Sequence, residues 1–539
     1  MATTVITPEA GEISETSLNN KQEQAAPIRE QPARKEWTAT QRVAFRIAFI
    51  FFIIMCIPVT GEWWNNLVTI NWFHLHYRDL YDIARFSPSI YKFQNPAYNL
   101  LGYIDWVEAL VIGIAGGLIW TAADKKNKQY HNLYYWLRVV VRYRAGIGII
   151  GFGFTKLFPV QMPYPSLGVL NAHFGDLTAQ KIYWLSVGIV PWYQVFAGVV
   201  ELAAGTMLFF RKTTTFGAIL LLGALGDITY VNFAYDGGVH VYASYFVLFS
   251  AFLLWYDAVP VYNLIVKERF TVPPVLIPVF TQKWLKVTRV VLKTGTIGIF
   301  LVWLYYLQYV NFKYDPYKQP STSGVKQLRG NYNVTEFKLN GQDIPYSPLD
   351  SVRWQGVTFE KWSSLTFNVN KPLNLDLSNG GGAAMRDINR NFELTGVAGG
   401  KRVFYYDADT VNKVLYLQDK LPEAGKRKGR RDNGGGGDKT GNGKIAKSFI
   451  PAEVQKNIRN EVTAIDPAAQ STRRKRGVPQ ELKDKRKRAH MILNYTADAT
   501  GAHIVLAGKD DKKNDVYIVL DRVNRQYALT DSKLVAGKY

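Results

Sequence analysis

Ionisable residues interrupt the long apolar stretches of this sequence, and they are the residues best suited to chemistry. A charge inside a bilayer costs free energy, so such residues are usually paired or functional. Glu201 and Arg144 lie about nine and eight residues from the same end of two apolar stretches, which gives them similar depth at about 1.5 Å per residue. The sequence therefore predicts that Glu201 pairs with Arg144 or Arg142, as a static ion pair or as a site that binds a ligand or handles protons.

A second group of ionisable residues is predicted near the opposite ends of the apolar stretches. Asp105 and Glu108 are spaced i and i+3, on one face of a helix. Lys156 closes one apolar stretch, Asp227 lies deep in another and His240 opens a third. Two carboxylates with a lysine and a histidine nearby could form a proton path or a polar substrate mouth. Equally, Asp105 and Lys156 could simply extend their side chains to the membrane surface.

The cysteine content and the glycines of the sequence exclude several kinds of redox site. Cys56 is the single cysteine, so one chain holds no disulfide, no CxxC pair and no thiolate metal cluster. Gly146, Gly148 and Gly151 spell GxGxxG inside an apolar stretch, where they predict close helix packing and not dinucleotide binding. No metal site is predicted, and no cofactor is evident from the residues.

Seven apolar stretches of about 20 residues are long enough to cross a hydrocarbon layer of about 30 Å. They lie at about 43–61, 101–123, 136–158, 187–210, 214–235, 240–258 and 288–310. Every second connection between them is rich in Lys and Arg, which are retained on the cytoplasmic side. The pattern predicts a multi-pass protein of the inner (cytoplasmic) membrane, with a disordered cytoplasmic tail at 1–40, a transmembrane bundle at 41–310 and an extracytoplasmic domain at 311–539.

The C-terminal residues 311–539 change period from helix to strand. Segments such as NYNVTEFKL, SSLTFNVN and DVYIVLDRV carry β-branched and aromatic residues in near alternation, separated by turn pairs such as Asn340-Gly341. Antiparallel strands with one apolar face most economically close as a small barrel, with a sandwich as the alternative. The predicted fold class is therefore a membrane α-helical bundle of about seven spans plus a C-terminal antiparallel β-domain.

A strongly basic insert interrupts the β-domain at about residues 421–490. The chain has a net charge of +22, and the insert holds about 19 Lys and Arg residues against about 8 Asp and Glu residues. It has few large apolar residues, which is typical of a disordered segment. Outside the cytoplasm we expect such a segment to meet anionic lipid or acidic envelope polymer and not nucleic acid. A solvated loop without a partner is the alternative.

Three stretches resemble the DoxX-like membrane proteins, and the resemblance covers about residues 135–260. They are RYRAGIGIIGFGFTKLFPVQMP (142–163), FAGVVELAAGTMLFFRKTTTFGAILLLGAL (196–225) and YVNFAYDGGVHVYASYFVLFSAFLL (230–254). In the family pattern an Arg-Tyr pair opens one helix, a Lys-Leu-Phe-Pro element closes it and a Glu lies in the next. These elements fall on Arg142 with Tyr143, on 156–159 and on Glu201, whereas His240 replaces an expected Lys. LRGNYNVTEFKLNGQDIP (328–345) resembles, more weakly, an extracytoplasmic β-module of some relatives.

The resemblance implies the membrane component of a quinone-linked redox or envelope-stress system. A bound quinone or a redox partner subunit would then carry the electrons, beside a polar core of Arg142, Arg144, Lys156 and Glu201. Two other functions remain open, and so does the question of whether the chain is an enzyme. One is a membrane-anchored scaffold, or binder of lipid or another apolar ligand, without catalysis. The other is a small-solute transporter that uses Asp105, Glu108 and Asp227.

Overall fold

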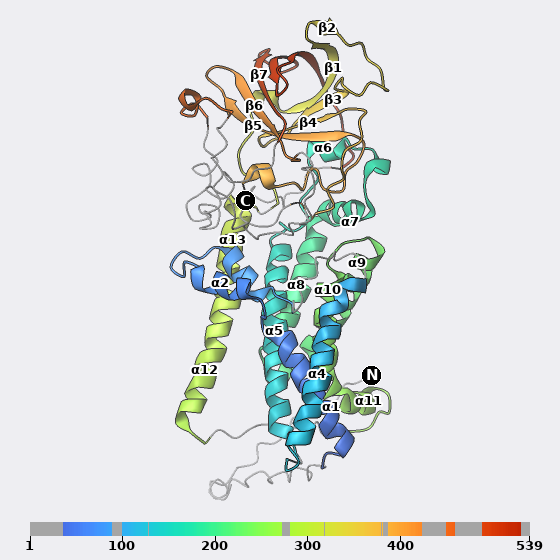
Figure 1. Cartoon of the computed structure of the whole chain (residues 1–539), viewed down its shortest axis with the longest axis vertical. Helices are drawn as coiled ribbons and strands as arrows, with labels where there is room; N and C mark the ends of the chain where they lie inside the picture. The colour runs from blue at the N-terminus through green and yellow to red at the C-terminus, as the bar shows by residue number, and fades with distance from the viewer. Residues whose placement is uncertain are drawn as a thin grey trace, which may run out of the picture.

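The computed structural model describes residues 36–529 except 89–99, 128, 272–280, 317, 379, 381–385, 423–448 and 459–487. The molecule is elongated, with a bundle of long helices at one end and a β-barrel at the other (Figure 1). Most of the predicted N-terminal tail, residues 1–35, lies outside the described residues. The first helix begins after a capping box, in which the Thr38 side chain accepts from the main-chain N–H of Gln41 and the Gln41 side chain from that of Thr38.

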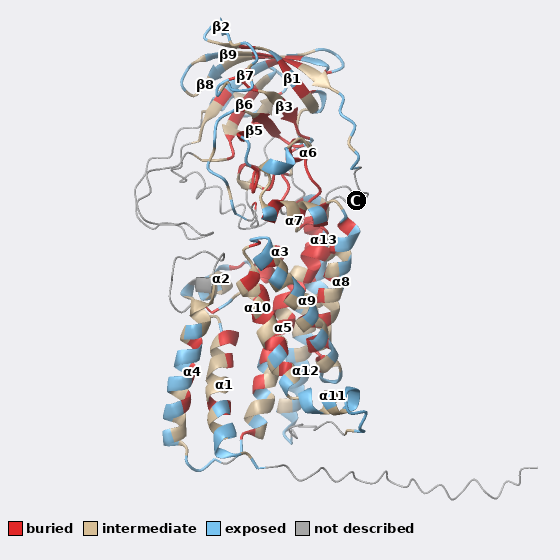
Figure 2. Ribbon diagram, turned by 90° about the vertical axis from the view of Figure 1, so that its right-hand side faces the viewer, coloured by how far each residue is buried: buried red, intermediate tan, exposed pale blue. Residues whose placement is uncertain are grey.

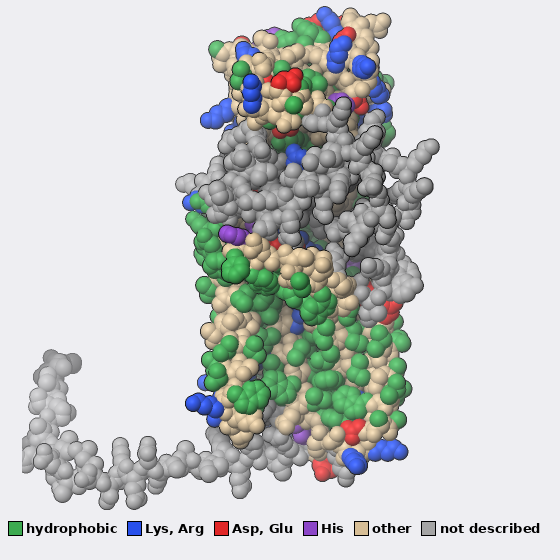
Figure 3. Space-filling model, turned by 60° about the vertical axis from the view of Figure 1, so that its left-hand side comes forward, with side chains coloured by type: hydrophobic (Ala, Val, Ile, Leu, Met, Phe, Trp, Pro, Cys, Tyr) green, Lys and Arg blue, Asp and Glu red, His purple; other side chains and the backbone are tan. Residues whose placement is uncertain are grey.

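The long helices of the bundle coincide with the apolar stretches of the sequence. They are α1 (Ala39–Cys56), α4 (Ile104–Ala123), α5 (His131–Leu157), α8 (Pro191–Leu208), α9 (Thr214–Ala234), α10 (His240–Trp255), α12 (Lys283–Ile297) and α13 (Leu304–Tyr314). A π-helical segment, Gly298–Trp303, joins α12 to α13. Hydrophobic side chains cover the sides of the bundle, and Lys and Arg gather at its lower end (Figure 3).

Short helices lie at both ends of the bundle. The helices α2 (Gly61–Thr69), α3 (Tyr77–Ala84), α6 (Leu167–Leu170) and α7 (Ala179–Gly188) lie at the barrel end, and α11 (Ala258–Ile265) lies at the opposite end (Figures 1 and 2). Single 3₁₀ turns occur at Leu100–Tyr103, Phe174–Asp176 and Arg211–Thr213. In Figure 2, α6 and α7 lie between the bundle and the barrel, so the connection from α5 to α8 is the part of the bundle that meets the β-domain.

Four helical segments are long and apolar enough to cross a membrane within the described residues: Ala39–Cys56, Ile104–Ala123, Arg211–Ala234 and Lys283–Tyr314. The number rises to six if α7 with α8, bent by 91°, and α10 with α11, bent by 73°, each form one span. Length and composition of the described helices do not confirm the predicted number of seven. The difference is α5, the predicted span 136–158, because it carries the charges of Arg138, Arg142, Arg144 and Lys156.

The β-domain is a closed antiparallel barrel, as the alternating segments predict. Its strands are β1 (Gly330–Leu339), β2 (Gln342–Asp343), β3 (Gly356–Phe359), β4 (Ser364–Asn368), β5 (Lys401–Asp409), β6 (Val414–Asp419), β7 (His490–Ala497), β8 (His503–Asp510) and β9 (Asp515–Val523). Neighbours in the sequence pair in order from β3 to β9, and β1 closes the ring by pairing with both β3 and β9. Only the short β2 stands outside the ring, as a hairpin partner of β1.

Large side chains fill the interior of the barrel. Inward positions alternate along each strand, as in Met491, Leu493 and Tyr495 of β7. The rings of Trp354 and Phe367 stack with their centroids 3.7 Å apart. Other aromatic residues of this core are Tyr332, Phe337, Phe359, Phe404 and Tyr406. An eight-stranded barrel is just narrow enough for its own side chains to fill it, so this barrel has a packed core.

Part of the predicted disordered insert is ordered against the barrel. Residues 423–448 and 459–487 lie outside the described residues, whereas 449–458 are described and include a 3₁₀ turn, Ala452–Val454. The amide of Asn457 donates to Asp409 Oδ2 at 3.2 Å, and the Phe449 ring lies 4.9 Å from that of His490. The sequence leaves room for a short helix around SFIPAEVQKNIRNEV within the insert, and the structure has a 3₁₀ turn there, in a segment with apolar residues that the basic runs lack.

Candidate functional site

An ion pair joins Lys156, in the last turn of α5, to Glu201 in α8. The Lys156 ammonium donates to Glu201 Oε1. Glu201 is 1% exposed, and its second oxygen, Oε2, has no hydrogen-bond partner in the part of the chain that the structure describes. Both charges are buried, and their mutual attraction offsets part of the free-energy cost of removing each one from water.

The predicted pairing of Glu201 with Arg142 or Arg144 is wrong. The prediction took the two helices to begin and end at the same depth. Instead, α5 begins at His131 and not at residue 136, and its first turns extend past the end of α8. Arg142 therefore bonds to Thr214, beyond the end of α8, and Arg144 bonds to carbonyls at the end of α3, whereas Glu201 lies beside the last turn of α5.

Glycines set this register by allowing the two helices into close contact. A Cβ added to Gly198 would lie 2.4 Å from the main-chain nitrogen of Leu157, and one added to Gly146 would lie 3.0 Å from the carbonyl oxygen of Gly205. The distance at Gly146 agrees with the prediction that this glycine allows close helix packing, and Gly198 of α8 does the same. The contact at Leu157 brings Lys156 opposite Glu201.

Arg144 binds main-chain carbonyls at the end of α3. Its Nη1 donates to the carbonyl oxygen of Ala84 at 3.0 Å, and its Nη2 donates to that of Phe86. The guanidinium carbon lies 3.8 Å from the centroid of the Phe86 ring. A cation is favourable at the C-terminus of a helix. Arg144 therefore fixes α3 against α5, which is a positioning role within the bundle.

The predicted outer group is divided in the structure. Lys156 belongs to the pair with Glu201, and Asp227 is exposed on α9. Asp105 is half-buried in the first turn of α4, and Glu108 in the next turn has one buried oxygen, Oε2, without a hydrogen-bond partner among the described residues. His240 is buried at the start of α10, with its ring 4.2 Å from that of Phe233.

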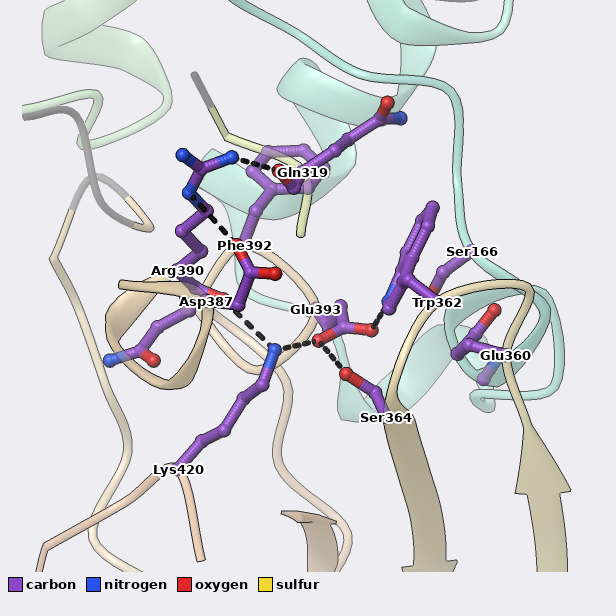
Figure 4. A network of polar contacts seen from close by, with 12 residues as sticks. Ser166, Gln319, Glu360, Trp362, Ser364, Asp387, Arg390, Phe392, Glu393 and Lys420 are labelled. Carbon is purple, nitrogen blue, oxygen red and sulfur yellow. Dashed lines mark hydrogen bonds and ion pairs between the residues drawn. The ribbon is translucent and has the colours of Figure 1, made fainter. Parts of the chain in front are cut away.

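The most extensive buried polar network lies at the junction between the barrel and the helices, where the sequence predicted no site. Figure 4 shows side chains from the loops after β3 and before β5 converging beneath the connection that carries α6 and α7. The Glu393 carboxylate is at its centre. It accepts from Lys420 Nζ at 2.6 Å, from Ser364 Oγ at 3.2 Å and from the Trp362 indole. Lys420 is 0% exposed, so this carboxylate supplies its counter-charge.

A second set of contacts in the network attaches the chain that leaves α13. The Arg390 guanidinium donates to Asp315 Oδ1 at 2.6 Å and to the carbonyl oxygen of Pro316 at 2.9 Å. Its Nε lies 3.5 Å from Asp387 Oδ1, and Asp387 Oδ2 accepts from the main-chain N–H of Thr322 at 2.8 Å. Arg390 is 1% exposed. These bonds attach Asp315, Pro316 and Thr322 to the loop that precedes β5.

Glu360 connects the barrel directly to the α5–α8 connection. It follows β3, and its carboxylate accepts from the main-chain N–H groups of Leu167 at 3.1 Å and Gly168 at 2.7 Å. Burial and the nearby Glu393 carboxylate raise the pKa of Glu360 to about 7. Lys401 is 4% exposed nearby, and its Nζ has no hydrogen-bond partner among the described residues. Burial lowers the pKa of Lys401 to about 8.

Lysines and aromatic rings complete the junction. Trp184 of α7 stacks on Phe392 of the barrel loop with centroids 6.0 Å apart. The Lys318 ammonium lies 4.0 Å from the Trp184 ring and the Lys181 ammonium 3.9 Å from the Phe392 ring, which is the geometry of cation–π contacts. Burial, with the charge of Arg85, lowers the pKa of Lys318 to about 7. The helix α7, the segment after α13 and the loop before β5 thus meet around the rings of Trp184 and Phe392.

The side chains at these sites can exchange protons, supply charge and form hydrogen bonds. Among the described residues, no group of three His, Cys, Asp or Glu side chains could hold a metal ion. The junction gave little signal in the sequence because its residues lie in loops without a period. The bond from Leu167 to Glu360 joins residues 193 positions apart, so no local pattern could predict it.

Comparison with known proteins gives one informative similarity. No family model matches the chain, and no solved structure matches it. A curated relative, the uncharacterized protein YwoB of Bacillus subtilis (strain 168), is 26% identical over 98 residues. The match covers 16% of this chain and 64% of that protein, so the chain spans less than two thirds of the relative's length.

Proposed function

We propose that this chain is a DoxX-like membrane protein whose helical bundle anchors and positions the β-barrel outside the cytoplasm, without catalysis of its own. The junction is the observation that supports this function. Two units that only share a chain need no more than a flexible linker. Here Glu360 of the barrel caps α6, and Arg390 holds the segment from α13. Contacts of this kind are expected where the placement of one unit on the other matters.

The proposed topology has seven membrane crossings, with α5 as the seventh. Its 27 residues span about 40 Å at 1.5 Å per residue. Its charged side chains are engaged inside the bundle, where Arg144 meets carbonyls and Lys156 meets Glu201. An odd number of crossings puts the N-terminus and the barrel on opposite sides, and the basic connections favour a cytoplasmic N-terminus in the inner membrane.

The distance between bundle and barrel tests the anchoring function. Spin labels at Tyr230→Cys on α9 and Thr335→Cys on β1, both exposed, in a Cys56→Ser background, report that distance in the full chain. We expect one narrow distribution, which broadens when Glu360→Ala removes the cap on α6. Lys509→Gln is the matched control, because its ion pair with Asp515 is exposed on the barrel. A broad distribution in the chain with an intact junction would contradict the proposal.

A second candidate function, the membrane part of a quinone-linked redox system, is favoured by one observation. Glu201 Oε2 is buried and accepts no hydrogen bond from the described residues, although the carboxylate is held beside Lys156. A positioned carboxylate with a free oxygen can accept a proton from a hydroxyl group. A quinol that passes its two electrons to a redox partner subunit also releases two protons, and Glu201 would accept one of these protons while Lys156 holds the carboxylate in place.

Ligand identification separates the two functions. The purified full chain is extracted with organic solvent, and the released small molecules are identified by mass spectrometry. The redox function predicts a stoichiometric quinone that is lost in Glu201→Gln while the protein stays folded. The anchoring function predicts no quinone, and a Glu201→Gln chain that is less stable but otherwise unchanged. Arg138→Gln, at the rim of the bundle, is the control and leaves quinone content unchanged under either function.

A further inference from the structure

A row of basic side chains runs along one face of α12. Lys283, Lys286, Arg289 and Lys293 are spaced three, three and four residues apart, which is the spacing of one helix face. No residue of α12 is buried, and in Figure 1 its lower end stands away from the other helices. The helix is therefore separated from the bundle at the end remote from the barrel, where it carries most of its charge.

The basic face turns toward the bundle at Lys293. The ammonium of Lys293 lies 4.2 Å from the centroid of the Phe210 ring, which follows α8. The carbonyl oxygen of Phe210 accepts from Thr214 Oγ1 at 3.0 Å, and Arg142 of α5 donates to the same hydroxyl group. Lys293 and Arg142, both positive, therefore approach the same short segment between α8 and α9.

Arg142 retains hydrogen-bonding capacity at this position. Its Nη1 donates to Thr214 Oγ1 at 3.2 Å, while its Nε is buried without a hydrogen-bond partner in the part of the chain that the structure describes. Thr214 is the first residue of α9, so the positive end of a 21-residue helix points to the same place. The nearby carboxylate of Asp257 is already engaged, by Arg138 at 3.4 Å and by Thr215 at 2.8 Å.

We propose that Lys293 of α12 and Arg142 of α5 together bind the phosphate head group of an anionic phospholipid. Like charges repel, so the approach of Lys293 to Arg142 is stabilised by an anion between them. Basic pockets between membrane helices bind the head groups of anionic lipids. The exposed apolar side chains beside the site favour a lipid over a soluble anion, because acyl chains would cover them; they include Val287, Val290, Val291 and Leu292.

The inference goes beyond the proposed function and does not depend on it. It requires only that the bundle lies in a lipid bilayer. An anchor, a redox protein and a transporter could each carry such a site, since the head group would hold α12 at a fixed distance from the bundle. Failure of the lipid experiment would leave the junction and the anchoring experiment unaffected.

Lipid retention by the full chain tests the proposal. The protein is equilibrated in mixed micelles of detergent with equal amounts of phosphatidylglycerol and phosphatidylcholine, and bound lipids are counted by native mass spectrometry. We expect one phosphatidylglycerol to be retained per chain in preference to phosphatidylcholine. Arg142→Gln and Lys293→Gln should each lower this retention about fivefold, as one basic residue fewer at a lipid head group implies.

Lys267→Gln is the matched control, because Lys267 is exposed at the same end of the bundle, after α11. It should leave retention unchanged. Thermal unfolding in phosphatidylcholine alone shows whether each variant is folded, and Lys293→Gln still tests the site if Arg142→Gln is unstable. Equal retention of the two lipids, or unchanged retention in the folded variants, would overturn the proposal. Release of phosphatidylglycerol by inorganic phosphate, but not by chloride at equal ionic strength, would instead assign the site to a soluble anion.

Discussion

The ion pair between Lys156 and Glu201 predicts strong energetic coupling between α5 and α8. Lys156→Met leaves the Glu201 carboxylate buried without its cation, and Glu201→Leu leaves the Lys156 ammonium without its anion. Removal of one partner of a buried pair typically destabilises a protein by about 3–5 kcal/mol, whereas replacing both by apolar residues of similar size is often neutral. We therefore expect each single change to cost about 3 kcal/mol, and the double change less than about 1 kcal/mol.

A double-mutant cycle measures this coupling. The four chains are unfolded in detergent micelles by titration with sodium dodecyl sulfate, and the loss of helix is followed by circular dichroism. Arg138 with Asp257 gives a matched cycle, because that pair has a longer separation of 3.4 Å and side chains 20% and 16% exposed. Its coupling should be below about 1 kcal/mol. If the double Lys156→Met and Glu201→Leu chain were as unstable as the sum of the two single changes, the two charges would not meet inside the bundle.

Three further changes have expected outcomes. Gly198→Ala would place a Cβ 2.4 Å from Leu157 N, so we expect a loss of at least about 2 kcal/mol, whereas Gly226→Ala in α9, with no atom within 4 Å, should be neutral or slightly stabilising in the same titration. Arg390→Lys removes the fork that joins Asp315 to Asp387, and hydrogen exchange of residues 315–322 should accelerate at least tenfold. The pKa of Glu360 is about 7 in the folded chain, against 4.5 for an ordinary glutamate. The protonated side chain therefore stabilises the folded chain fully below about pH 4.5, and this stabilisation of about 3 kcal/mol is lost as the pH rises to about 7. Glu360→Gln should remove that loss from a series of thermal unfolding curves between pH 5 and pH 8.

Periodicity in the sequence predicted the architecture, because residues one period apart in a helix or a strand face the same environment. The alternation in NYNVTEFKL became β1, with Tyr332, Val334 and Phe337 inside the barrel. The apolar stretches became helices of the bundle. The register between α5 and α8 could not be predicted in the same way. It depends on where Gly198 meets Leu157, and several registers of two apolar helices satisfy the same hydropathy.

The outer surface of the barrel explains why the junction escaped prediction. On β7 and β8, buried and less buried positions alternate, as expected when one face is solvated. On β4, Ser364, Leu365, Thr366 and Phe367 are all buried, although the sequence still alternates polar with apolar residues. A polar residue on a strand normally indicates a solvated face. Here the loops and the α5–α8 connection cover that face, and Ser364 bonds to Glu393 instead of water.

The covered face also constrains how the two units can fold. If the barrel packed on the helices in another placement, Glu360 would be buried without the main-chain donors of α6, and Arg390 without Asp315. A buried ion pair often stabilises a protein no more than two apolar side chains of similar size would. A buried charge that has lost its partner, however, strongly destabilises the protein. The junction therefore does little to increase net stability, but it strongly disfavours every arrangement in which the barrel is placed differently. That is the behaviour expected of contacts that specify position, and it is the reason for our proposal that the bundle positions the barrel.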